Sequence, residues 1–246
     1  MSLTLPDMPS IFLNKSKIIK VFGQSTVTGP IGKRLDFEFG DIIALDNPDD
    51  LVIQKATGSF YIGHIFEGTV INEGVWIVSE GSGSTITQDN NYITLSAPNN
   101  TNYPVLSHRF NTRQTRGGDA EFECYVRRNA AGATGECVIG LMLDQITGCF
   151  FEMVTDENTW RANSTRGVGE TTTGTPFTIT NNTWVKFKIR IETNKAKFYV
   201  NNVLKTTVSG ANVPDDKDLF IRTHCFNSGD SCILDIRWTR ADWAGL

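Results

Sequence analysis

Residues 184–192 show which kind of secondary structure dominates this chain. Branched or aromatic apolar side chains occupy every second position of this segment from Val185 to Ile191, and most positions between them are charged. A period of two residues is typical of a β-strand with one buried face and one face in water. Similar segments, separated by turns rich in Gly, Asn and Thr, continue from about residue 65 to the C-terminus. None of them has the period of a long amphipathic helix, so we expect an all-β body.

About a dozen strands in some 180 residues predict a two-sheet antiparallel jelly-roll sandwich. Each expected strand is a short alternating or apolar segment between turn residues. The expected strands cover residues 69–72, 75–79, 92–96, 105–110, 120–127, 136–143, 149–154, 159–163, 184–192, 196–201, 203–208, 219–226 and 232–238.

The first 64 residues differ from this body. Their apolar residues come in short groups, such as 18–22 and 35–39, which Gly and Pro separate. Strands of this length cannot close a hydrophobic core alone. One short helix is expected over residues 51–56, after the capping group 47–50. We therefore divide the chain into an extended N-terminal arm, residues 1–64, and a jelly-roll domain, residues 65–246.

Charge is unevenly distributed along the chain. Residues 1–35 carry five basic residues and one acidic residue, a net charge of +4, whereas residues 36–90 carry ten acidic residues and one basic residue, a net charge of −9. This asymmetry favours docking of the arm on another subunit of a homo-oligomer or larger assembly, although a solvated face explains it equally well. The residues expected to contact the partner are Lys15, Lys17, Lys20, Ile18, Ile19 and Phe22.

Composition argues against several classes of protein. A net charge of −4 argues against a nucleic-acid partner, and no run of 18 apolar residues predicts a membrane span. The N-terminus lacks the pattern of a signal peptide, so we expect a chain made in the cytoplasm. The cysteines have no CxxC spacing and are expected to be reduced and mostly buried, a zinc site with His224 being the alternative. They are Cys124, Cys137, Cys149, Cys225 and Cys232.

The C-terminal half resembles a known superfamily. A strand that opens on Trp184 precedes the hairpin segment 197–202 and a final strand, 233–238. This order resembles the concanavalin A-like lectin/glucanase superfamily, including the laminin-G-like and pentraxin-like jelly rolls, of the kind found in bacteriophage structural proteins. The resemblance covers residues 65–246 and implies a jelly-roll fold. These families usually have Gly after the hairpin Asn or Asp, and Asn202, which tolerates a positive φ, takes that place here.

Glucanases of this superfamily carry an E-x-D-x-E series of carboxylates on one strand. Glu121 and Glu123 begin such a series, but Tyr125 takes the next place, and Glu152 belongs to a different predicted strand. We therefore assign no catalytic residue and expect no enzyme, with a Glu121/Glu123 dyad as the alternative.

Lectin-like jelly rolls bind sugars through stacked aromatic rings and polar side chains. Trp160 is expected to be an exposed aromatic residue beside Arg161. Neighbouring strands would bring further polar residues together, although cross-strand structural pairs are the competing interpretation. The predicted ligand-binding residues are Trp160, Arg161, Arg222, His224, Asp235 and Arg237.

We expect no metal and no cofactor. The alternative is a calcium ion, whose ligands would be carboxylates in the loops. The residues in question are Asp144, Asp156 and Glu157.

Together these features predict a non-enzymatic structural and binding component of a virus particle, such as a bacteriophage capsid-decoration, tail or fibre protein. The arm would dock on other subunits of the particle, and the lectin-like domain would project outward, where a cell-surface glycan is its expected ligand. The alternatives are a free carbohydrate-binding module and a glycoside hydrolase.

Overall fold

The computed structural model describes strands within the first 65 residues by their backbone, and most of the body with side chains from Phe66 onward. The described residues are 17–20, 25–28, 34–37, 42–47, 50–54, 60–66, 69–71, 73, 76–89, 91–97, 104–111, 119–129, 135–153, 159–227 and 232–243.

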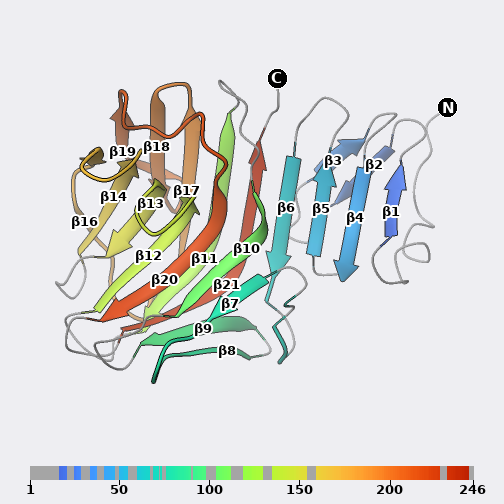
Figure 1. Cartoon of the computed structure of the whole chain (residues 1–246), viewed down its shortest axis with the longest axis horizontal. Coiled ribbons are helices and arrows are strands. Elements are labelled where there is room, and N and C mark those ends of the chain that lie inside the picture. The colour runs from blue at the N-terminus through green and yellow to red at the C-terminus, as the bar shows by residue number, and fades with distance from the viewer. Residues whose placement is uncertain are drawn as a thin grey trace.

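Two large antiparallel sheets lie face to face (Figure 1). The first has eleven strands. Strand β9 pairs with the first half of β21 and β8 pairs with β9, whereas β6 pairs with the second half of β21. In spatial order they are β1 (Lys17–Lys20), β4 (Ile42–Asn47), β5 (Asp50–Gln54), β6 (Phe60–Ile65), β21 (Cys232–Trp243), β11 (Ala120–Asn129), β17 (Val185–Glu192), β18 (Lys195–Val200) and β19 (Val203–Ser209), with β9 (Tyr92–Ala97) and β8 (Thr85–Asp89).

The second sheet has eight strands, and a separate two-stranded sheet joins β2 (Ser25–Thr28) to β3 (Arg34–Phe37). In spatial order the eight are β15 (Thr171–Thr173), β14 (Thr159–Thr165), β13 (Gly148–Met153), β12 (Gly135–Met142), β20 (Phe220–Asn227), β10 (Val105–Asn111) and β7 (Trp76–Ser79), with β16 (Phe177–Thr178) paired to β14.

The core lies between the two sheets because each strand turns its apolar positions inward. On β17, the side chains of Phe187 and Ile189 are completely buried, whereas Arg190 is exposed. The ring of Phe187 stacks on that of Phe151 from the opposite sheet, with centroids 4.1 Å apart. The predicted all-β, two-sheet sandwich is therefore confirmed.

Several local predictions are also tested by the structure. Asn202 has a φ of 67° in the turn between β18 and β19, which confirms its role in place of Gly. The helix expected over residues 51–56 is wrong, because these residues belong mainly to β5, which hydrogen-bonds to both β4 and β6. Pairing on both sides outweighs the weak helical tendency of so short a segment. The strand expected over residues 69–72 is also wrong, since Thr69 and Val70 form a bend.

The arm continues the sheet of the body rather than standing apart from it. Strand β6 pairs with β21 from Ile65, opposite Trp238, to Phe60, opposite Trp243. The N-terminal strands at the right of Figure 1 follow in the order β5, β4 and β1. The boundary drawn after residue 64 thus falls within β6. Among the described residues, no helix has the length and apolar character needed to cross a membrane.

Candidate functional site

The outer face of the eight-stranded sheet is hollowed by two adjoining cavities, with volumes of about 520 Å³ and about 450 Å³. We call them together the groove. Gln145, in the loop after β12, lines both cavities. The larger cavity is lined by Ile77, Ser79, Glu80, Gly81, Val105, Ser107, Leu143, Gln145, Phe220 and Arg222. The smaller is lined by Glu136, Val138, Gln145, Ile146, Phe150, Glu152, Asn163, Thr165, Thr171, Thr173 and His224.

Strand alternation decides which side chains face the groove. On β13, Cys149, Phe151 and Met153 belong to the core between the sheets. The residues between them, Phe150 and Glu152, line the groove instead. The same alternation turns Asn163 of β14, Glu136 of β12 and His224 of β20 toward the groove, together with apolar residues such as Val138. Intervening residues such as Ala162, Ile139 and Ile221 belong to the core.

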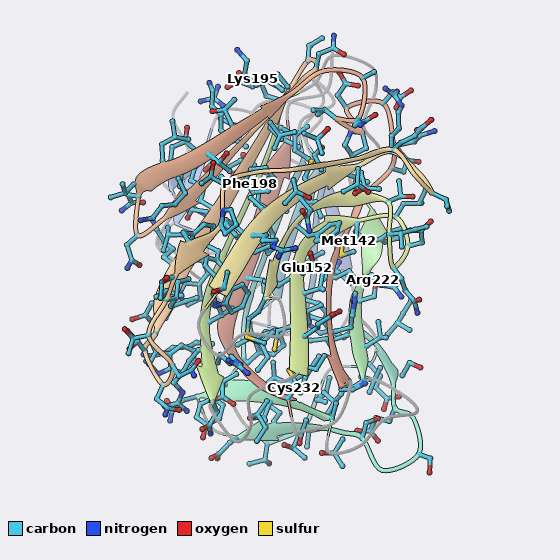
Figure 2. The ribbon with its side chains drawn as sticks, turned by 90° about the vertical axis from the view of Figure 1, so that its left-hand side faces the viewer. Met142, Glu152, Lys195, Phe198, Arg222 and Cys232 are labelled. Carbon is cyan, nitrogen blue, oxygen red and sulfur yellow. The ribbon has the colours of Figure 1, made fainter. Side chains whose placement is uncertain are left out.

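The groove has an apolar floor beside its polar groups. Val138, Met142 and Phe150 form a small hydrophobic cluster on this outer face, separate from the main core. Figure 2 labels Met142 together with Glu152 and Arg222 of the same sheet. A floor of this kind with a few fixed polar groups is typical of a ligand site.

Two carboxylates from neighbouring strands meet in the smaller cavity. Glu136 lies on β12 and Glu152 on β13, where Glu152 pairs with Val138, two residues after Glu136. Partial burial, followed by repulsion from Glu152, raises the pKa of Glu136 above its usual value, while the charge of Arg161 opposes this rise. Glu136 therefore holds its proton to higher pH than an ordinary glutamate.

Asn163 fixes one of these carboxylates. Its side-chain amide donates a hydrogen bond to Oε2 of Glu152. The side chain of Asn163 is buried, at 4% exposure, yet its Oδ1 atom has no hydrogen-bond partner among the described residues. A buried acceptor without a partner is costly unless a ligand or water supplies the missing donor.

His224 completes the same cavity from β20. Burial, followed by the charge of Arg222, lowers the pKa of His224 to about 4. The imidazole is therefore neutral at pH 7 and can both donate and accept a hydrogen bond.

The structure brings together only some of the predicted ligand-binding residues. Arg222 and His224 line the groove, and Arg161 is paired with Glu152 beside it. The prediction that Trp160 is exposed is wrong, because this side chain is 1% exposed and packs against Phe187 in the core. The strand expected over residues 159–163 is confirmed by β14, but the sequence did not show that Trp160 lies on its inward face.

Asp235 and Arg237 do not join this group. They lie on β21, in the eleven-stranded sheet, so the expected meeting with Arg222 and His224 is wrong. The carboxylate of Asp235 pairs with Arg127 of β11 at 2.7 Å and accepts a hydrogen bond from Thr94. This is the cross-strand structural pair that the competing interpretation described.

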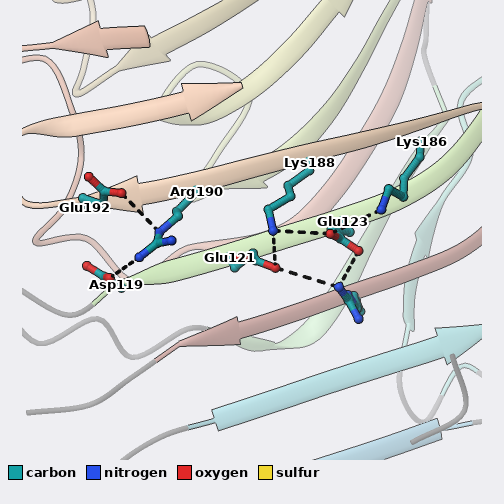
Figure 3. A network of polar contacts seen from close by, with 8 residues as sticks. Asp119, Glu121, Glu123, Lys186, Lys188, Arg190 and Glu192 are labelled. Carbon is teal, nitrogen blue, oxygen red and sulfur yellow. Dashed lines mark hydrogen bonds and ion pairs between the residues drawn. The ribbon is translucent and has the colours of Figure 1, made fainter. Parts of the chain in front are cut away.

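Glu121 and Glu123 lie on the outer face of the eleven-stranded sheet (Figure 3). They do not form a free dyad, because each is paired with basic side chains. Glu123 is nearly buried and contacts Arg240 at 2.5 Å and Lys188 at 3.5 Å. Glu121 contacts Lys188 at 2.7 Å. These carboxylates belong to a charge ladder that joins three neighbouring strands.

The remaining predicted site residues are less informative. Asp144 accepts hydrogen bonds from the backbone N–H groups of Ile146 and Thr147, so it stabilises its own loop. Asp156 and Glu157 lie outside the described residues.

Of the expected partner contacts, the segment from Lys17 to Lys20 forms β1 and pairs with β4 of the same chain. Lys15 and Phe22 lie outside the described residues, and docking on a partner stays a prediction.

Sequence reasoning missed Glu136 and Asn163. Each occupies an outward position on a strand whose inward residues are apolar, so the alternation did carry a signal. Recognising the site also required the order β14-β13-β12-β20, which brings these strands side by side.

Comparisons with known proteins show which solved structures share the fold of this chain. No family model matches the sequence, and no curated protein is similar to it in sequence. Many solved structures match instead, among them the following three. The laminarinase catalytic domain of Thermotoga maritima is 11% identical, with a TM-score of 0.55 over 75% of this chain and 97% of that one. The β-glucanase of Bacillus licheniformis is 14% identical, with a TM-score of 0.54 over 78% of this chain and 100% of that one. A glycosyl hydrolase family 16 protein of Mycobacterium smegmatis is 12% identical, with a TM-score of 0.55 over 73% of this chain and 98% of that one.

These structures contradict the expectation that the chain is not an enzyme, since a laminarinase catalytic domain and a β-glucanase share its fold. The expectation required all carboxylates on one strand, whereas Glu136 and Glu152 come from two. Carbohydrate-active proteins are thus among its structural neighbours, and the chain has the jelly-roll fold that the resemblance implied.

Proposed function

We propose that the protein binds a carbohydrate chain in the groove of the eight-stranded sheet. The observation that carries this proposal is the buried Oδ1 of Asn163, an acceptor without a partner beside the carboxylate of Glu152. Sugars offer hydroxyl donors for such acceptors and apolar ring faces for a floor like that of Val138 and Phe150. The structural likeness to carbohydrate-active jelly rolls supports the same ligand class.

A second candidate is hydrolysis of the bound glycan, and the pair Glu136/Glu152 favours it. Two carboxylates with different proton affinities are the usual equipment for breaking a glycosidic bond. Glu136, whose pKa is raised, would give its proton to the glycosidic oxygen as the C–O bond breaks. The carboxylate of Glu152 would attack the anomeric carbon or take a proton from the attacking water.

Titration calorimetry with soluble β-glucans, such as laminarin, tests binding. We expect Asn163→Ala and Glu152→Gln to weaken binding at least tenfold, because the first removes the buried acceptor Oδ1 and the second replaces a charged acceptor by a neutral one. Glu121→Gln is the matched control on the opposite face and should leave binding unchanged. Equal effects of all three variants, or no binding of any glycan in a broad array, would contradict the proposal.

Reducing-end release from the same glucans separates hydrolysis from binding. If Glu136 and Glu152 are catalytic, Glu136→Gln and Glu152→Gln should abolish release, while Glu136→Gln still binds the glucan. Binding by the wild type without any release would leave the protein a binding module and exclude the second candidate.

The sequence also predicts a more specific role, as a component of a virus particle. Its support is the basic segment of residues 1–35, whose strand β1 is the last strand of the eleven-stranded sheet in the described part of the chain and could pair there with another chain. Copurification of the chain with particles is the direct test, as a free binding module would stay in the soluble fraction.

A further inference from the structure

Three of the five cysteines converge at one end of the sandwich. Cys137 of β12 and Cys225 of β20 are directly paired across neighbouring strands, and Cys232 begins β21 in the opposite sheet. Their sulfur atoms all lie within 4.8 Å of one another, and all three side chains are completely buried. Figure 2 labels Cys232 at this end of the molecule.

The distances between the sulfur atoms are unequal. Sγ of Cys137 lies 2.7 Å from Sγ of Cys232 and 3.7 Å from Sγ of Cys225. Non-bonded heavy atoms rest about 3.5–4.0 Å apart, so the second distance is an ordinary contact and the first is not. A disulfide would bring the first pair to about 2 Å, a small further step.

A shared metal ion fits these distances less well. Zinc bonds thiolate sulfur at about 2.3 Å in tetrahedral geometry, which holds two sulfur ligands about 3.8 Å apart. Cys137 and Cys232 are much closer than that. Within the described residues, no histidine or carboxylate joins the three thiols as a fourth ligand, and His224 faces the groove instead.

A glycine permits the close approach of the two sheets here. A Cβ atom at Gly135 of β12 would collide with Cβ of Cys232. Because Gly135 has no side chain, the start of β21 lies against β12, where Cys232 reaches Cys137.

We infer that Cys137 and Cys232 form a disulfide that joins the two sheets, with Cys225 as a free neighbouring thiol. This inference replaces the sequence-based expectation that all five cysteines are reduced. A disulfide is neutral, so it fits a buried apolar site better than a charged metal–thiolate group.

The oxidation needs an acceptor for two electrons, and glutathione disulfide supplies it during folding. The thiolate of Cys232 attacks one glutathione sulfur, forms a mixed disulfide and releases one glutathione. The thiolate of Cys137 then attacks Sγ of Cys232, which closes the protein disulfide and releases the second glutathione. Two protein thiols lose one proton each, and one glutathione disulfide is reduced to two glutathiones.

The surroundings of Cys232 favour this order. Hydrogen bonds from Cys137 and Cys225, with the charge of Arg128 adding to them, hold the pKa of Cys232 well below its ordinary value. Burial raises the pKa of Cys225 well above its ordinary value. A lowered pKa favours the thiolate, which makes Cys232 a better nucleophile than Cys225.

The test is a thiol titration of the full chain after folding in a glutathione buffer. The protein is denatured without reductant and titrated with a chromogenic thiol reagent. We expect three reactive thiols, and five after reduction. Mass spectrometry of a digest made without reductant should show the peptides of Cys137 and Cys232 joined and lighter by two hydrogen atoms.

Single variants identify the pair. Cys225→Ser and the matched core variant Cys124→Ser should each keep the disulfide and show two reactive thiols. Cys137→Ser and Cys232→Ser should show four. Five reactive thiols in the wild type, a link to Cys225, or a stoichiometric metal that a chelator releases would each overturn the inference, and none of these results bears on glycan binding.

Discussion

Asn163 of β14 hydrogen-bonds to Glu152 of β13 across a diagonal of the sheet, because its direct cross-strand partner is Phe150. This contact ties two strands of the groove together and fixes the carboxylate over the apolar floor. It also leaves Oδ1 of Asn163 as the acceptor that a ligand would use.

Replacing Asn163 by Asp tests this relationship. The new carboxylate would lack the amide donor to Glu152 and would add a second negative charge beside it, so the pKa of Glu136 should rise further. We expect glycan binding at pH 7 to fall by about tenfold or more, with partial recovery at pH 5, as the added carboxyl takes up a proton. Calorimetry at both pH values measures this change. An equal loss at pH 5 and pH 7 would show that repulsion between carboxylates is not the cause.

His224 should make stability depend on pH. Its folded-state pKa of about 4 lies below the ordinary value of 6.5, so the unfolded chain binds the proton more readily. The stability that neutral His224 provides is complete above pH 6.5 and declines as the pH falls toward 4, by about 3 kcal/mol in total. In His224→Gln, the urea concentration at the unfolding midpoint should depend less on pH over this range. A wild-type slope that persists in His224→Gln would assign the effect to other groups.

The charge ladder around Glu123 should support stability without supporting ligand binding. Glu123 is almost fully buried beneath Arg240 and two lysines. Glu123→Gln therefore leaves Lys186 without its counter-charge, and leaves Lys188 and Arg240 with that of Glu121 alone. We expect a loss of about 1–3 kcal/mol in the free energy of unfolding, measured in urea. Arg190→Gln is the control, since this exposed ion pair with Asp119 should contribute little. A loss of glycan affinity in Glu123→Gln would be unexpected, because the groove is on the opposite sheet.

The proposed disulfide should stabilise the oxidised protein. It closes a chain segment with its ends 95 residues apart and joins β12 to β21. Because it restricts the unfolded chain, the disulfide should add about 2–4 kcal/mol to the free energy of unfolding. Urea unfolding with and without reductant should show this difference in the wild type and in Cys225→Ser. The difference should vanish in Cys137→Ser, and a reductant effect that survives there would point to another pair.

The sequence predicts the body of this fold better than its site. Alternation is a local property, so residues 184–192 revealed a strand and its buried face directly. The groove depends on which strands become neighbours, and the alternation of β12 alone cannot tell that Glu136 meets Glu152. Trp160 shows the same limit, because an aromatic residue on a short predicted strand is exposed only if the strand turns that face outward. The meeting of Cys137 with Cys232 depends on the packing of two sheets.

The pairing of β6 with β21 predicts how the arm can be removed. A chain that lacks residues 1–56 keeps β6, so the ladder along Trp238–Trp243 stays covered. We expect this variant to be a soluble, folded β-protein by circular dichroism and size-exclusion chromatography. A chain that lacks residues 1–66 would expose the hydrogen-bonding groups of β21 as a sheet edge and should aggregate. Unfolding of the shorter deletion would show that β1 to β5 are needed for the fold of the body. If both variants stay soluble and folded, β6 does not protect that edge.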